Sequence, residues 1–144
     1  MEWHPDAPGS GVGRMYHGLV QHLPRAGVEV SGLVTGSVPL RDAPSSIRAF
    51  ASPAASLPRR LWKLRSSAKE MLRTRTVDLI ASHFALYAAP LVGLFDDRPL
   101  VAHFHGPWAL ESRAEGEPAW SVWGKALLER SVYRRAQRFI VLSS

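Results

Sequence analysis

The 144 residues suffice for one domain with a hydrophobic core but are too few for two ordinary domains. The absence of cysteine excludes disulfides and thiolate metal sites, and it agrees with a cytoplasmic protein. Eighteen Lys and Arg residues against twelve Asp and Glu residues give a formal net charge of +6, which suits a polyanionic partner. The longest apolar run, residues 84–95, is too short to span a bilayer.

Helical and strand patterns alternate along the first half of the chain. Apolar residues recur at helical spacing over residues 11–24, which predicts a first amphipathic helix. Residues 28–35 predict a strand. Residues 36–57, rich in Pro, Ser and Ala, predict a loop with a short strand at 47–50, and a second helix is expected at 58–74.

The second half continues this alternation and ends on an apolar strand. The expected elements are a strand at 77–82, a helix at 86–95, a strand at 100–104, a loop at 106–118, a helix at 119–136 and a strand at 139–142. Trp120, Trp123 and Leu127 share one face of the last helix.

Alternating strands and helices are typical of an α/β protein with a Rossmann-like parallel sheet and helices on both faces. We expect about four or five strands, with right-handed crossovers between them. A doubly wound fold normally opens with a strand, but Glu2-Trp3-His4 is all that precedes the first turn. The chain also stops at Ser144, directly after a strand. We therefore expect residues 1–144 to be a single partial domain whose first strand is largely missing.

Glycines stand at the start of the first predicted helix. Gly11 and Gly13, followed by Arg14, would let backbone N–H groups approach a phosphate at the helix N-terminus. A flexible turn with Ser10 as N-cap is the alternative. The spacing is not G-x-G-x-x-G, and Thr35 stands where a ribose-binding acid is expected, which argues against a nicotinamide dehydrogenase. The sequence has no standard P-loop motif either.

Histidines cluster at the end of the strand predicted at residues 100–104. His103 and His105 flank Phe104, and Gly106 then turns the chain. Ligands of open α/β sheets bind beyond the carboxyl ends of strands, so His105 is placed to hydrogen-bond a sugar hydroxyl or a phosphate oxygen. The H-x-H spacing also fits zinc, but no third ligand has informative spacing. A structural histidine pair is the remaining alternative.

Two further groups of polar residues are weaker candidates. His83 follows the strand predicted at 77–82 and would either contact a ligand or cap the next helix. The predicted loop after Trp108 carries four charged residues, Glu111, Arg113, Glu115 and Glu117. Paired carboxylates can act as acid and base, although charges in a surface loop are commonly only solvated.

The basic excess is concentrated between Arg59 and Arg75, where seven Lys or Arg residues face one acid, Glu70. This stretch suggests a binding module for anionic membrane or nucleic acid, or simply a solvated helix face. Nucleic-acid binding usually adds aromatic stacking platforms, and Trp62 is the one aromatic residue in the stretch. We therefore expect no nucleic-acid partner.

The order of these motifs resembles a known family. After the glycine turn come R-A-G-V-E-V, then V-D-L-I-A-S-H, then P-L-V-A-H-F-H-G-P-W with Glu111 soon after, and finally L-L-E-R-S-V-Y-R-R-A-Q-R-F-I-V-L-S. This pattern is similar to the N-terminal domain of retaining glycosyltransferases of the family 4 type, which have the GT-B fold. The resemblance extends over residues 8–143.

The resemblance implies two facing Rossmann-like domains, of which this chain would be the N-terminal, acceptor-side one. The C-terminal domain, which holds the nucleotide sugar, would lie outside these residues, so this chain alone is expected to be inactive. The resemblance further implies hexosyl transfer to a glycan or lipid-linked acceptor, without metal or another cofactor. Peripheral membrane contact at the inner face is compatible with it.

The resemblance also assigns roles to particular residues. His105 would contact the transferred sugar near the reacting carbon. Gly11, Gly13, Arg14 and Gly106 would approach the donor phosphate or the acceptor. His83, together with His103 and Glu111, would line the acceptor side.

Overall fold

The computed structural model describes residues 2–3, 6, 9 and 11–141. The chain divides into two compact units, Met1–Met71 and Leu72–Ser144, with the boundary inside a helix. Ser10, the predicted N-cap, and Leu142, at the end of the last predicted strand, lie outside the described residues.

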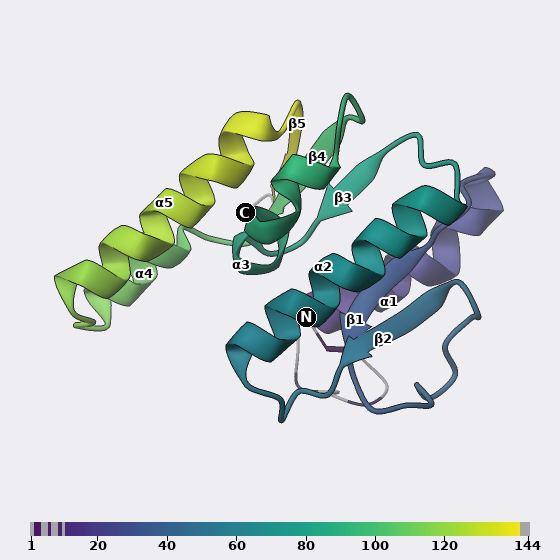
Figure 1. The fold of residues 1–144 in the computed structure, drawn as a ribbon, viewed down its shortest axis with the longest axis horizontal. Coiled ribbons are helices and arrows are strands. Elements are labelled where there is room, and N and C mark those ends of the chain that lie inside the picture. Colours follow the sequence, from purple (N-terminus) through teal and green to yellow (C-terminus); the bar gives the residue numbers. More distant parts are fainter. Residues whose placement is uncertain (1, 4–5, 7–8, 10, 142–144) are drawn as a thin grey trace. The chain divides into compact units, whose positions relative to one another are not determined.

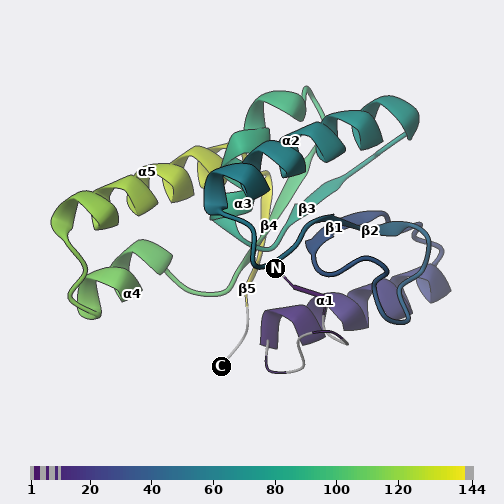
Figure 2. The same ribbon diagram turned by 60° about the horizontal axis from the view of Figure 1, so that its bottom comes forward.

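The first unit is a pair of parallel strands between two helices (Figure 1). Its elements are α1 (Gly11–His22), the 3₁₀ helix η2 (Leu23–Ala26), β1 (Gly32–Thr35), β2 (Ile47–Ala51) and α2 (Leu57–Thr74). Helices α1 and α2 lie on opposite sides of the strand pair (Figure 2). The core of this unit contains Trp3, Tyr16, Val20, Val34 and Ile47.

Glu2 and Trp3 lie against the end of β1. Glu2 forms an isolated parallel bridge with Thr35, and the Trp3 backbone N–H donates to the Thr35 carbonyl oxygen at 3.3 Å. The Trp3 side chain is fully buried, and its indole Nε1–H donates to the carbonyl oxygen of Arg41 at 2.6 Å. The short segment before the glycine turn thus pairs as a strand would at this place, and it supplies a large core side chain.

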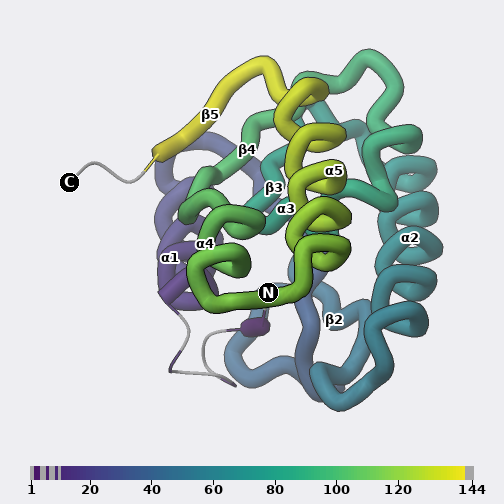
Figure 3. Tube along the Cα trace, turned by 90° about the vertical axis from the view of Figure 1, so that its left-hand side faces the viewer, coloured from purple at the N-terminus to yellow at the C-terminus, as the bar shows by residue number. Residues whose placement is uncertain are grey.

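The second unit is built on a three-stranded parallel sheet of order β3-β4-β5. Its elements are β3 (Ile80–Ser82), α3 (Ala85–Ala88), the 3₁₀ helix η3 (Ala89–Leu94), β4 (Leu100–Phe104), α4 (Trp108–Ala114), α5 (Ala119–Arg135) and β5 (Arg138–Val141). Leu100 and Val132 join Ala85, Ala88 and Phe95 in one core, so α3, η3 and α5 pack with β4. Helices α4 and α5 lie side by side (Figure 3).

The expected fold class is confirmed, because the protein is α/β with parallel strand pairs and flanking helices. The strands form a sheet of two and a sheet of three, where the sequence suggested a single sheet of about four or five. Two expected strands are also shorter than predicted, because residues 28–31 and 77–79 are not in strands. Val28 and Leu79 are 46% and 53% exposed, so these two residues do not lie in a buried strand although they are apolar.

One other expectation needs correction. Residues 108–114, expected within a loop, form helix α4. Trp120, Trp123 and Leu127 lie on α5, and they are exposed by 78%, 66% and 45%. None of the described helices combines the length and the apolar character that crossing a bilayer requires.

The core of the second unit gives a test of this packing. Leu100 is fully buried, whereas Leu110 on α4 is 61% exposed. We expect Leu100→Ala to lower the unfolding free energy by about 2–5 kcal/mol. Leu110→Ala, the matched control, should change it by less than about 0.5 kcal/mol. Urea unfolding measures both, and equal effects would contradict the core assignment.

Candidate functional site

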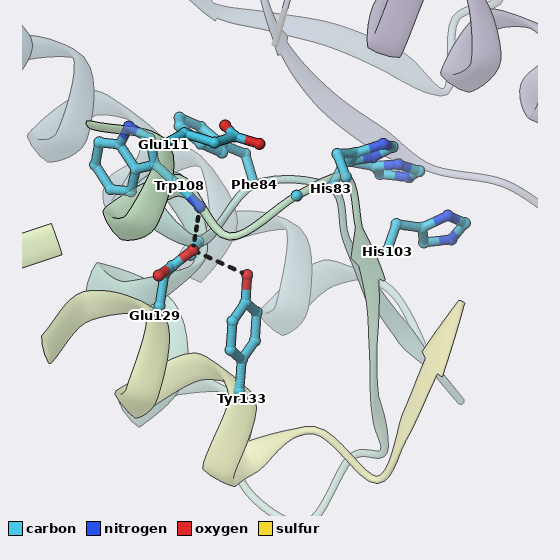
Figure 4. A pocket seen from close by; sticks show the side chains of 10 residues that line it. His83, Phe84, His103, Trp108, Glu111, Glu129 and Tyr133 are labelled. Atoms are coloured by element: carbon cyan, nitrogen blue, oxygen red, sulfur yellow. Dashed lines mark hydrogen bonds between the residues drawn. The ribbon is translucent and has the colours of Figure 1, made fainter. Parts of the chain in front are cut away.

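The carboxyl ends of β3 and β4 bring three histidines together. Ser82 pairs with Ala102, so the residues that follow these two positions, His83 and His103, are neighbours at the same edge of the sheet. Their ring centroids lie 4.1 Å apart in a stacked arrangement (Figure 4). His105 lies 6.1 Å from His83 and 6.4 Å from His103, between ring centroids. The sequence placed these histidines at strand ends, and the structure brings them into one cluster.

All three imidazoles are neutral near neutral pH. Burial, together with the neighbouring His103 and His105, lowers the pKa of His83 to about 3. Burial also lowers the pKa of His103, with His105 adding to the effect, and burial lowers the pKa of His105. A neutral imidazole offers one N–H donor and one acceptor nitrogen. The cluster is therefore suited to hydroxyl groups, which both donate and accept hydrogen bonds.

Gly106 allows a carboxylate to approach the chain just after the histidines. Its φ angle of 146° is one that side-chain-bearing residues rarely adopt. The carboxylate of Glu111 lies against the position that a Cβ at residue 106 would occupy. Glu111 lies in the first turn of α4, where the sequence suggested a loop. From there its side chain reaches back to Gly106, in the turn that follows His105.

The three histidines, Gly106 and Glu111 line one pocket, drawn in Figure 4. The remaining lining residues are Phe84, Ala85, Trp108, Glu129 and Tyr133. The cavity volume is about 90 Å³. Pockets for drug-sized ligands typically have about 300–1,000 Å³. This pocket therefore fits part of a ligand, such as one polar ring, better than a whole nucleotide sugar.

Glu129 is a pocket residue that the sequence did not single out. It lies on α5 and is 8% exposed. Its carboxylate accepts hydrogen bonds from the backbone N–H of Trp108 at 2.9 Å, from that of Ala109 at 3.4 Å, and from the Tyr133 hydroxyl at 3.4 Å. The available signal was an acid on the same helical face as the core residue Val132, three positions later.

The other charged residues expected after Trp108 lie outside the pocket lining. Glu117 accepts hydrogen bonds from Lys125 and Ser121 of α5. Arg113 and Glu115 are exposed. Of the four charges proposed from the sequence, Glu111 alone lines this pocket.

The glycine turn belongs to the first unit. Helix α1 begins at Gly11; Gly11 and Arg14 are exposed and Gly13 is buried. Their part in binding a phosphate or an acceptor stays a prediction.

The zinc alternative for His103 and His105 gains no support from side-chain placement. Within the described residues, no group of three or more His, Cys, Asp and Glu side chains is arranged to hold a metal ion.

Comparison with known proteins gives one family match. The family model described as Glycosyltransferase Family 4 matches residues 9–144, which include the glycine turn and the whole histidine pocket. No curated protein and no solved structure matches the chain.

The buried histidine makes stability depend on pH in a defined direction. The ordinary histidine pKa is 6.5, and that of folded His83 is about 3. Below pH 6.5 the unfolded chain therefore binds a proton that the folded chain does not, so stability falls as the pH drops towards 3. We expect His83 to account for a loss of about 2–3 kcal/mol between pH 7 and pH 4.5.

Urea unfolding of wild type and His83→Gln at both pH values measures this contribution. The variant should lose less stability on acidification. His22→Gln, on an exposed residue of α1, should behave as wild type. An unchanged acid sensitivity in His83→Gln would contradict the neutral, buried state of this imidazole.

Proposed function

The chain belongs to glycosyltransferase family 4, and from this premise we propose that it serves hexosyl transfer from a nucleotide sugar to a glycan or lipid-linked acceptor, with retention of configuration. The supporting observation is the cluster of three neutral histidines beside Glu111 at the carboxyl ends of adjacent parallel strands. A sugar offers several hydroxyl groups, and this cluster offers matching donors and acceptors without a net charge on the imidazoles. The match gives no support to a non-catalytic basic module.

We assign His105 to the transferred sugar. In the reaction, the bond between the anomeric carbon and the donor phosphate oxygen breaks, and the nucleoside diphosphate leaves with that electron pair. The acceptor hydroxyl oxygen bonds to the anomeric carbon, and its proton passes to the departing phosphate. A neutral imidazole at the lip of the pocket can hydrogen-bond a sugar hydroxyl and hold the anomeric carbon in place as charge develops on it. His83, His103 and Glu111 would line the acceptor side.

The nucleotide would be held elsewhere. In this proposal Gly11, Gly13 and Arg14, with Gly106, approach the donor phosphate or the acceptor. A second, donor-binding domain outside these 144 residues binds the nucleotide. The small volume of the pocket lined by the three histidines agrees with binding of the sugar there and of the nucleotide in the other domain. These residues by themselves are then expected to give no turnover.

A change at His105 tests the assignment in the full-length protein. We expect His105→Ala to lower kcat/KM for sugar transfer by about 30- to 1,000-fold, because an oriented hydrogen bond in the transition state contributes about 2–4 kcal/mol. His105→Asn, which retains a donor and an acceptor, should recover part of the loss. His22→Ala, on an exposed residue outside the pocket, should leave transfer unchanged. Wild-type kinetics in His105→Ala would make His105 structural.

We further propose peripheral contact with an anionic membrane at the inner, cytoplasmic face, through α2. Arg59, Trp62, Lys69 and Arg73 follow one another at helical spacing along the outer side of this helix, and all are exposed. Leu64 and Ala68 on the other side are buried. Trp62 is 68% exposed, and an exposed Trp beside cations suits a lipid headgroup region.

Vesicle sedimentation tests the membrane contact. Removing two cations, as Lys69→Ala with Arg73→Ala, should weaken binding to phosphatidylglycerol-containing vesicles about 30-fold at low salt, because each basic residue contributes about 1 kcal/mol. Phosphatidylcholine vesicles should bind weakly throughout. The control pair Arg113→Ala with Arg130→Ala removes two exposed cations from the second unit. Equal losses in both pairs would refute a specific role of α2.

A further inference from the structure

Burying the Glu129 carboxylate on α5 costs free energy unless its oxygens accept hydrogen bonds. A buried carboxylate loses its hydration, so it persists in a fold when protein groups donate hydrogen bonds to it. Glu129 and Val132 are the buried residues of α5. The carboxylate takes a position on that helix that an apolar side chain would otherwise occupy, which indicates that its hydrogen bonds serve a purpose beyond packing.

Its partners are the first two backbone amides of α4. The N–H groups of Trp108 and Ala109 donate to different oxygens of the same carboxylate, at 2.9 and 3.4 Å. The first amides of a helix have no partner within that helix. Pro107, at the N-cap position, makes no side-chain cap. Glu129 therefore caps α4 from a neighbouring helix, and its negative charge faces the positive end of the helix dipole.

This cap fixes the connection that carries the pocket residues. His105, Gly106 and Pro107 join the end of β4 to the start of α4. The sheet holds one end of this connection through the β4–β5 ladder, and Glu129 holds the other at Trp108. The Trp108 N–H also donates to the Gly106 carbonyl oxygen at 3.1 Å. With both ends held, Glu111 in the first turn of α4 is kept against Gly106.

We propose that Glu129 is a positioning residue: it holds the start of α4 so that Glu111 and His105 face the pocket in a fixed geometry. The inference rests on the proposed function for its effect on transfer, but not for its effect on the structure. Glu129 acts through the amides of Trp108 and Ala109, so it needs no contact with the sugar.

Glu129→Gln tests the cap with almost no change of shape. The amide keeps one acceptor oxygen, but its NH₂ group would face a backbone N–H in place of the second oxygen. Hydrogen exchange followed by mass spectrometry should show exchange of the amides at residues 108–109 at least about tenfold faster than in wild type. Exchange in β4 should be unchanged.

Two controls separate this effect from general loss of stability. Val132→Ala weakens the same helix core without touching the carboxylate, and it should speed exchange throughout the second unit rather than at residues 108–109 alone. Glu117→Gln changes a carboxylate in the connection between α4 and α5 that does not bond to the start of α4, and it should leave these amides protected. Wild-type exchange at residues 108–109 in Glu129→Gln would overturn the proposal.

Transfer kinetics of the full-length protein test the functional half. Glu129→Gln should lower kcat by about tenfold and leave the donor KM within about twofold. Glu129→Asp, which keeps the charge on a shorter side chain, should be intermediate in both exchange and kcat. Faster exchange with wild-type kcat would refute positioning. If wild type transfers no sugar, the proposed function fails, while the exchange experiment still decides whether Glu129 holds α4.

Discussion

The parallel pairing of β3 with β4 is the constraint on which the candidate site depends. Because Ser82 lies beside Ala102, whatever follows the two strands must emerge at the same edge of the sheet. Two histidines emerge there with stacked rings, and His105 joins them two residues later. Burial at this edge lowers the pKa of each of the three, so they approach one another as neutral rings rather than as repelling cations. The register of the β3–β4 pairing thereby brings the histidines together at one edge of the sheet, where burial keeps their imidazoles neutral.

A second constraint comes from the helix pair that follows. Helix α4 is seven residues long, too short to be stable by itself, so its position depends on what it packs against. Lys125 of α5 donates a hydrogen bond to Ser112 at 2.7 Å and lies 5.0 Å from the centre of the Trp108 ring, and Glu129 binds the first amides. The pocket wall formed by Trp108 and Glu111 is therefore set by side chains of α5, far along the sequence.

The sequence predicted the parts of this site that depend on local pattern and missed those that depend on distant partners. The strand ends at Ser82 and Phe104 could be located because apolar runs stop there. Helix α4 was missed because its cap is supplied by Glu129, twenty-one residues after Trp108, rather than by a residue before it. The exposure of Trp120 and Trp123 lay beyond the sequence pattern, since helical spacing identifies a shared face but not whether a partner covers it.

The central claim is that a sugar binds in the second unit, at the edge of the sheet where His83, His103 and His105 lie together. The most direct test is an NMR titration of the imidazole resonances of the full-length protein with UDP-glucose and GDP-mannose, using whichever donor supports transfer. The account predicts that the resonance of His105 shifts on addition of that donor, whereas that of His22, at the end of α1 away from Gly11, does not. A donor that supports transfer but leaves His105 unperturbed would contradict it.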